Sequence, residues 1–205
     1  MDFIKSFGFK DVDNAALIKL NTIIEVIVFN MINNVLHVVN ALKVKTVKKA
    51  HFIGVMHVLK EAAARCTSGQ RGGTVMASEF FGHDSGRFFS SVDFHNTAYI
   101  DGLSRGSLDV AQAGGGSEKA TPDAVTIAEV KAIVAKYKKE MDHDSLKMAA
   151  DVYPVIQAAV TANMIKLLYA CKSGRGTSQT LTSKLIMKSI KDSGSMLAHL
   201  KYVWK

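Results

Sequence analysis

The longest apolar run of the chain covers residues 15–42 and reads AALIKLNTIIEVIVFNMINNVLHVVNAL. Its apolar residues recur at spacings of three and four, which predicts a helix spanning about 42 Å at about 1.5 Å per residue. The β-branched stretch 23–29 also suits a strand, but we favour a helix because no Gly or Pro interrupts the run. The polar residues are too scattered to form one face, so this helix should be central and covered from both flanks. We expect Asp13 or Asn14 to cap its start.

A short basic segment with the sequence KVKTVKK follows this run at residues 43–49. It should end the long helix, and Thr46 is expected to cap a short helix beyond it. The apolar face of that short helix would consist of Phe52, Ile53, Met56 and Leu59. Because an apolar segment opens the chain at residues 3–9, the first block reads as short helix, long helix, basic loop and short helix.

The last block of the chain repeats this plan. Residues 126–140 are amphipathic, and a second long helix is predicted at about residues 145–172, capped by Asp142 or Asp144. Pro154 lies inside that second run, so it should either kink the helix or move its start to about residue 153. A Gly-Arg-Gly turn then leads to a short helix at 184–192, and the apolar tail at 196–204 suits a final helix.

The middle of the chain, residues 67–121, has a different composition, rich in Gly and in aromatic residues. A free linker rarely contains this many aromatic rings. We therefore expect residues 70–108 to pack against the first and last blocks, and only about 111–121 to be flexible. Three arginines in this segment could enter a DNA minor groove or pair with nearby acids, and we favour pairing. The arginines are Arg71, Arg87 and Arg105, and the acids are Glu79, Asp84 and Asp101.

Composition limits the class of protein. The 205 residues are 48% apolar, which is too high for a disordered chain, and two cysteines cannot build a disulfide framework. We find no signal segment and no stretch of 18 uncharged apolar residues, so we expect neither secretion nor a membrane span. The net charge of +8 is concentrated in the first and last blocks, while the middle is slightly acidic. Two basic surfaces suit a nucleic acid, although lysines that only solvate helix faces would give the same count.

The repeated plan resembles the histone fold. The sequence Lys-Thr-Val-Lys-Lys-Ala at residues 45–50 is similar to the second loop and last helix of core and archaeal histones, and Thr-Leu-Thr-Ser-Lys at 180–184 is similar to the same region. Two such folds in one chain resemble the histone doublets of large DNA viruses. The resemblance implies an all-α protein in which residues 1–66 and 122–205 each form a histone fold. These would pair as an intramolecular pseudodimer with crossed long helices, joined by a connector at 67–121.

For function, the resemblance implies a DNA-packaging protein that contacts phosphates in nucleosome-like assemblies with other histone-fold chains. Such a protein would be found in a virion, a nucleus or a viral factory. It would bind neither a small-molecule substrate nor a membrane. The family's first-loop arginine falls near Asp11 here, which is acidic. The rival interpretation is a histone-fold scaffold subunit of a transcription-factor or virion complex with little DNA contact.

The resemblance assigns DNA contact to residues in the second loops, at the helix starts and at the end of the helix at 126–140, where backbone N–H groups and lysines would receive phosphate. They are Lys43, Lys45, Thr46, Lys48, Lys49, Lys138, Lys139, Arg175, Thr180, Thr182 and Lys184. The simpler interpretation of the same residues is capped helices with solvated lysines.

No pattern for catalysis or metal binding stands out. The His-Asp-Ser-Gly stretch at 83–86 has the residue types of a catalytic triad, but adjacent residues cannot align as one, so a turn is the better interpretation. His51 and His57 are six residues apart, which does not place them on one helix face for zinc. We therefore expect no enzymatic activity, no cofactor and no metal.

Overall fold

The computed structural model describes residues 2–41, 43–55 and 122–192, and this part of the chain is mostly helical. The fold is therefore all-α in class, as the sequence predicts. The expectations for the Gly-rich and aromatic middle, for Met56, His57 and Leu59, and for a helix at 196–204 concern residues outside the described ranges.

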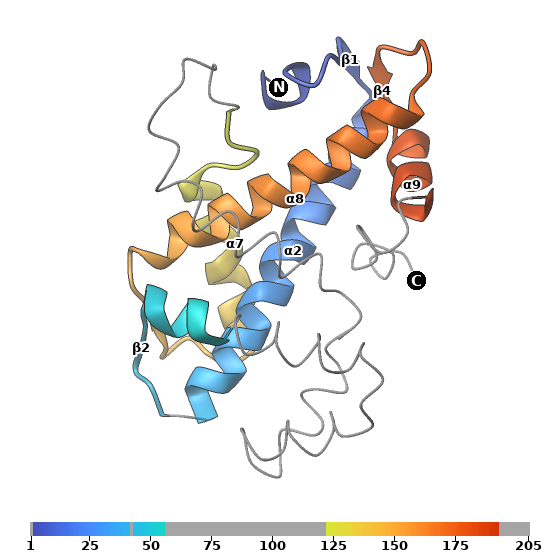
Figure 1. Ribbon diagram of the computed structural model, residues 1–205. Helices are drawn as coiled ribbons and strands as arrows, with labels where there is room; N and C mark the ends of the chain where they lie inside the picture. Colours follow the sequence, from blue (N-terminus) through green and yellow to red (C-terminus); the bar gives the residue numbers. More distant parts are fainter. Residues whose placement is uncertain (1, 42, 56–121, 193–205) are drawn as a thin grey trace, which may run out of the picture.

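The described residues form short, long and short helices in each block, with two-residue strands between them (Figure 1). The long helices are α2 and α8, and a further helix covers residues 49–55 between β2 and the end of the first described block. In chain order the labelled elements are α1 (Asp2–Lys5), β1 (Asp11–Val12), α2 (Asn14–Ala41), β2 (Thr46–Val47), α7 (Ile127–Glu140), β3 (Lys147–Met148), α8 (Val152–Gly174), β4 (Thr180–Leu181) and α9 (Ser183–Asp192).

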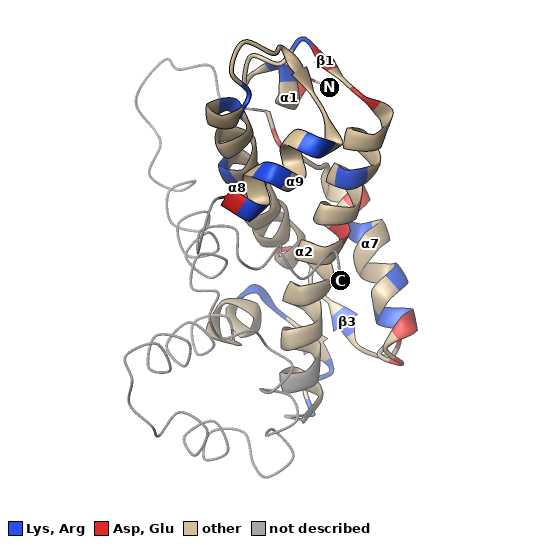
Figure 2. Cartoon of the chain, turned by 90° about the vertical axis from the view of Figure 1, so that its right-hand side faces the viewer, with Lys and Arg blue, Asp and Glu red and all other residues tan. Residues whose placement is uncertain are grey.

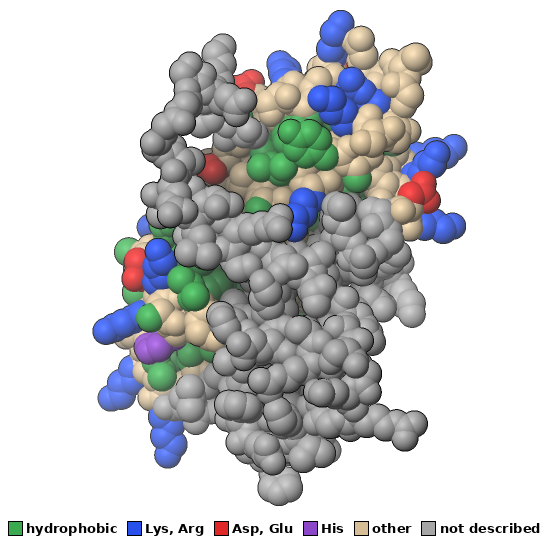
Figure 3. Space-filling view, in the orientation of Figure 1, with side chains coloured by type: hydrophobic (Ala, Val, Ile, Leu, Met, Phe, Trp, Pro, Cys, Tyr) green, Lys and Arg blue, Asp and Glu red, His purple; other side chains and the backbone are tan. Residues whose placement is uncertain are grey.

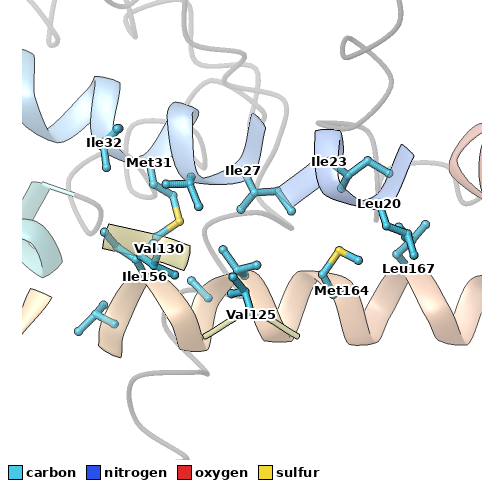
Figure 4. Packing of buried hydrophobic residues seen from close by; sticks show 14 of the residues in the cluster. Leu20, Ile23, Ile27, Met31, Ile32, Val125, Val130, Ile156, Met164 and Leu167 are labelled. Atoms are coloured by element: carbon cyan, nitrogen blue, oxygen red, sulfur yellow. The ribbon is translucent and has the colours of Figure 1, made fainter. Parts of the chain in front are cut away.

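The core lies where α2 and α8 pack across each other, with α7 against both (Figure 1). Figure 4 shows the side chains of Ile27 and Met31 on α2 facing those of Ile156 and Met164 on α8. All four are at most 2% exposed. Buried side chains recur along α2 with few breaks, so the prediction of a central helix covered from more than one side is confirmed.

The four strands form two parallel pairs that join the blocks. In one pair, Asp11 lies opposite Thr180 and β1 runs beside β4. In the other, Thr46 lies opposite Lys147 and β2 runs beside β3. Each pair connects the segment before one long helix to the segment after the other long helix. The two blocks therefore contact each other at both ends of the molecule as well as in the core.

Local sequence signals determine where two helices start. The Asp13 carboxylate accepts a hydrogen bond from the Ala16 N–H at the start of α2, which confirms the predicted cap. At α7, the Thr126 hydroxyl accepts from the Glu129 N–H at 3.2 Å, while the Glu129 carboxylate accepts from the Thr126 N–H at 2.7 Å. This reciprocal capping box fixes α7 at the predicted place.

Three predictions about boundaries and caps were wrong. The second long helix starts at Val152 instead of residue 145, because residues 147–148 pair with β2 as a strand. Pro154 falls in the first turn, where its missing N–H costs no helical hydrogen bond, so the alternative start near residue 153 is confirmed to within one residue. Neither Asp142 nor Asp144 caps α8, since the residue before the helix is Asp151, whose side chain makes no capping bond. Thr46 does not cap the helix at 49–55, because it lies in β2.

Two described helices are long and apolar enough to cross a membrane by length and composition: residues Asn14–Leu36 of α2, and α8. The core helix of a soluble protein and a signal sequence near the N-terminus pass the same test, and both helices here contribute buried residues to one shared cluster. That the chain does not span a membrane stays a prediction.

Candidate nucleic-acid interface

Cationic side chains gather at the end of the molecule formed by β2 and β3. Lys45 and Lys48 flank β2, Lys49 begins the helix at 49–55, and Lys147 lies in β3; all four side chains are exposed. The Lys147 N–H donates to the Lys45 carbonyl at 3.1 Å, so these two residues are adjacent across the pair. Figure 3 shows Lys and Arg side chains on this lower-left side of the molecule, where Figure 1 places β2. The sequence-predicted lysines of the first block therefore lie at one end of the molecule.

The end of α2 positions Lys43 at the same end of the molecule. Its φ of 55° turns the chain out of the helix, and two bonds close the end: Lys43 N–H to the Asn40 carbonyl at 2.9 Å, and Val44 N–H to the Val39 carbonyl at 2.9 Å. This is the Schellman arrangement, which usually has Gly in the left-handed position. Lys43 is exposed, so the turn presents a further cation beside β2.

The helix at residues 49–55 begins with a bond to a histidine. The Lys48 N–H donates to Nδ1 of His51 at 3.3 Å, so this ring nitrogen acts as the acceptor in the way a capping-box side chain does. The backbone of Lys48 is thus tied to the helix start, while its side chain remains exposed.

The end of α7 contributes cations of two different kinds to this end. The Lys138 ammonium donates to the Asp144 carbonyl at 3.4 Å, and the side chain is half-buried, so it stabilises the turn that leads into β3. Lys139 is exposed and makes no such bond within the described part of the chain. Of these two predicted contact residues, only Lys139 has a side chain that is exposed to solvent.

At the opposite end, formed by β1 and β4, the arginine side chain contacts other residues of the chain. The Arg175 guanidinium donates from Nη1 to the Gly8 carbonyl at 2.6 Å and lies 5.0 Å from the centre of the Phe9 ring. Gly8 has a φ of +83°, which other residues rarely adopt. Arg175 therefore anchors the opening segment to the end of α8, although the sequence interpretation assigned it to DNA contact.

The threonines at this end are also partly engaged. The Thr182 hydroxyl accepts from the Leu185 N–H at 3.2 Å and so caps α9, while Thr180 is half-buried in β4. Lys184 is exposed in the first turn of α9. Opposite Thr180 lies Asp11, the first residue of β1, so this strand pair begins with an exposed acid.

Sequence reasoning missed two groups of cations. The sequence prediction placed Lys147 inside the second long helix. Pro154 was the one signal that this helix begins later and that residue 147 precedes it. Lys188 and Lys191 are exposed with Lys184 along α9, at spacings of four and three that put them on one outward face (Figure 2). The amphipathic pattern of the short helix could have indicated this face.

An ion pair and a ring contact join α2 and α7 away from both ends. Glu25 Oε2 accepts from the Lys136 ammonium at 2.9 Å and from the Tyr137 hydroxyl at 3.0 Å, and Tyr137 packs on Phe29 with ring centres 4.9 Å apart. The hydrogen bond from Lys136 lowers the pKa of Glu25 below its ordinary value of 4.5, although partial burial opposes this. Burial and the bond to Glu25 raise the pKa of Tyr137. This contact holds the first block against the second.

No group of three or more His, Cys, Asp and Glu side chains that could hold a metal occurs in residues 2–41, 43–55 and 122–192. A scan of protein-family models and searches of curated proteins and of solved structures give no match to this chain. The case for a function therefore depends on the geometry and charge of the described residues.

Proposed function

We propose that this chain is a histone-fold doublet that packages double-stranded DNA through phosphate contacts, together with further histone-fold chains. In this proposal residues 1–66 and 122–205 are the two histone folds, and they pair within one polypeptide. The observation that carries it is the pair of parallel strand contacts, in which β1 joins β4 and β2 joins β3 across the two blocks.

The arrangement of the helices supports the pairing. Each block has a long central helix between short ones, and α2 and α8 bury each other's apolar side chains in one cluster. Neither long helix could be covered by the short helices of its own block. Two helix-strand-helix units that depend on each other in this way are what a histone pair requires.

The charge of the described surface supports a polyanionic partner. The lysines around β2 and β3 are exposed and lie on main-chain segments that are fixed by backbone hydrogen bonds. Lysines held on a rigid backbone neutralise phosphates without ordering a flexible tail. Since phosphates are the same at every base pair, the proposed binding has little sequence preference.

The test is fluorescence anisotropy with two labelled duplexes of unrelated sequence and about 30 base pairs, measured over a series of salt concentrations. We expect similar affinities for both duplexes, and an affinity that falls linearly with salt on logarithmic axes, by about 0.9 in slope for each phosphate neutralised. Failure to bind either duplex at low salt would refute the proposal.

The second candidate is a histone-fold scaffold inside a protein assembly. It is favoured by Arg175 and Lys138, whose cationic groups bond to carbonyls of the chain itself. Replacing four exposed lysines by Glu separates the two candidates. They are Lys45, Lys48, Lys49 and Lys184, and the matched control replaces Lys5, Lys10, Lys131 and Lys172, which are exposed and lie outside both the β2–β3 end and the cationic face of α9.

Under the DNA-packaging proposal, the first variant no longer compacts a long duplex. The control variant compacts the duplex to an extent close to that of the unmodified chain. Oligomeric mass by light scattering checks assembly in the same samples. Intact assembly of the unmodified chain and of both variants, with no compaction of DNA by the unmodified chain, would favour the scaffold.

A further inference from the structure

The two strand pairs are built on the same hydrogen-bond pattern. At one end, the Lys147 N–H donates to the Lys45 carbonyl and the Ala149 N–H to the Val47 carbonyl. At the other end, the Asp11 N–H donates to the Gln179 carbonyl at 3.4 Å and the Asp13 N–H to the Leu181 carbonyl at 3.1 Å. The bonds therefore match residue for residue, except that the Gln179 carbonyl also accepts from the Lys10 N–H at 2.8 Å, whereas the Leu146 N–H at the other end donates to the His143 carbonyl.

This match makes each residue at one end the counterpart of one residue at the other. Residues 45–49 correspond to 179–183, and residues 147–149 correspond to 11–13. Thr46 and Thr180 are counterparts, and each lies opposite the first residue of the partner strand. Two ends with the same backbone can thus be compared for charge, position by position.

The comparison gives opposite charges. The eight positions at the β2–β3 end hold four lysines and no acid, whereas the same eight positions at the β1–β4 end hold two aspartates and no lysine or arginine. The lysines are Lys45, Lys48, Lys49 and Lys147, and their counterparts are Gln179, Thr182, Ser183 and Asp11. All four lysines are exposed.

The two aspartates have different surroundings in the fold. The Asp13 carboxylate accepts from the Ala16 N–H, so a negative charge already occupies the start of α2. Asp11 is exposed at the place that Lys147 has at the other end. A phosphate approaching the β1–β4 pair would meet these carboxylates, while the Arg175 guanidinium is held by Gly8 and Phe9.

We infer that the β2–β3 end is the main phosphate-binding site of this chain, and that the β1–β4 end contributes little to duplex binding. This inference rests on the proposed function and specifies which surface performs it. A single protein molecule then contacts DNA only through its β2–β3 end. To cover a longer stretch of DNA, several molecules must each bind through their own β2–β3 end. The residues that determine the asymmetry are Lys147 and Asp11, which occupy equivalent positions with opposite charge.

The test compares two triple variants that each remove three positive charges. One replaces Lys45, Lys48 and Lys147 by Gln, and the other replaces Lys10, Lys184 and Lys188 by Gln. Lys10 and Lys184 lie one residue outside the compared positions, and every replaced side chain is exposed, so neither variant disturbs the core. Circular dichroism and urea unfolding check that both variants fold.

We expect the first variant to lower the salt slope of duplex binding by about 2.7, at about 0.9 per lost phosphate contact, with at least a tenfold loss of affinity at low salt. The second variant should change the slope by less than about 1. Equal losses in the two variants would overturn the inference and leave the proposed function intact. If the unmodified chain binds no duplex, both the inference and the proposed function are overturned. The same titration with polyglutamate identifies the alternative partner, because binding to polyglutamate but not to DNA would assign the lysines to an acidic protein.

A gain-of-charge variant tests the same inference in the opposite direction. Asp11→Lys places at the β1–β4 end the residue that the β2–β3 end has, on a strand whose backbone bonds do not involve the side chain. We expect tighter duplex binding and a salt slope larger by up to about 1. An unchanged affinity and slope would show that Asp11 does not limit this end, and would count against the inference.

Discussion

Truncating one isoleucine at the crossing of the long helices should cost far more stability than truncating another on the same helix. Ile27 is 1% exposed and faces α8, whereas Ile18 is 68% exposed. Ile27→Ala removes three buried carbons, worth about 2.4 kcal/mol at about 0.8 kcal/mol each. The cavity left behind adds to this, so we expect a loss of about 2 to 5 kcal/mol of unfolding free energy. Ile18→Ala should change it by less than about 0.5 kcal/mol.

The assay is urea unfolding followed by circular dichroism at 222 nm, with the midpoint and slope fitted for each variant. Because the structure places Ile27 in a core shared by both blocks, its truncation should move a single transition as a whole. Equal midpoints for Ile27→Ala and Ile18→Ala would refute the shared core. So would two separate transitions of which only one moves.

Three further predictions concern single side chains. Thr126→Ala removes the cap of α7 and should lower the unfolding free energy by about 1 kcal/mol in urea; no change would contradict the capping box. The pKa of Glu25 is lower in the folded chain than its ordinary value of 4.5. Ionised Glu25 therefore contributes to the free energy of unfolding above pH 4.5, and this contribution is lost as the pH falls through the pKa of the folded chain. Stability of Glu25→Gln should therefore fall less than that of the unmodified chain between about pH 5 and about pH 3. Burial raises the pKa of the Cys171 thiol, so in a Cys66→Ser variant this thiol should react with a thiol reagent only as urea unfolds the chain; rapid reaction in the folded state would contradict its burial.

The helices could be predicted because their signals are local. An uninterrupted apolar run defined α2, and Asp13 and Thr126 are capping residues that lie next to the helices they start. Each of these signals depends on neighbours within four residues along the chain. Local sequence therefore sufficed for the class of fold and for most helix boundaries.

The strands and their cations could not be predicted in the same way. β3 exists because Lys147 and Met148 meet β2, about a hundred residues earlier in the chain, and no local period marks such a pair. Arg175 looked available for DNA because its partner, the Gly8 carbonyl, is 167 residues away. The lysines were visible in the sequence, but which of them share a surface depends on contacts between the two blocks.

The central claim is that this chain packages double-stranded DNA, and nuclease protection tests it most directly. A duplex of several hundred base pairs is saturated with the full chain at low salt and digested with micrococcal nuclease. The account predicts DNA that is protected by the unmodified chain and much less by the variant lacking Lys45, Lys48 and Lys147. Digestion at the rate of naked DNA, with the protein folded and in excess, would contradict it.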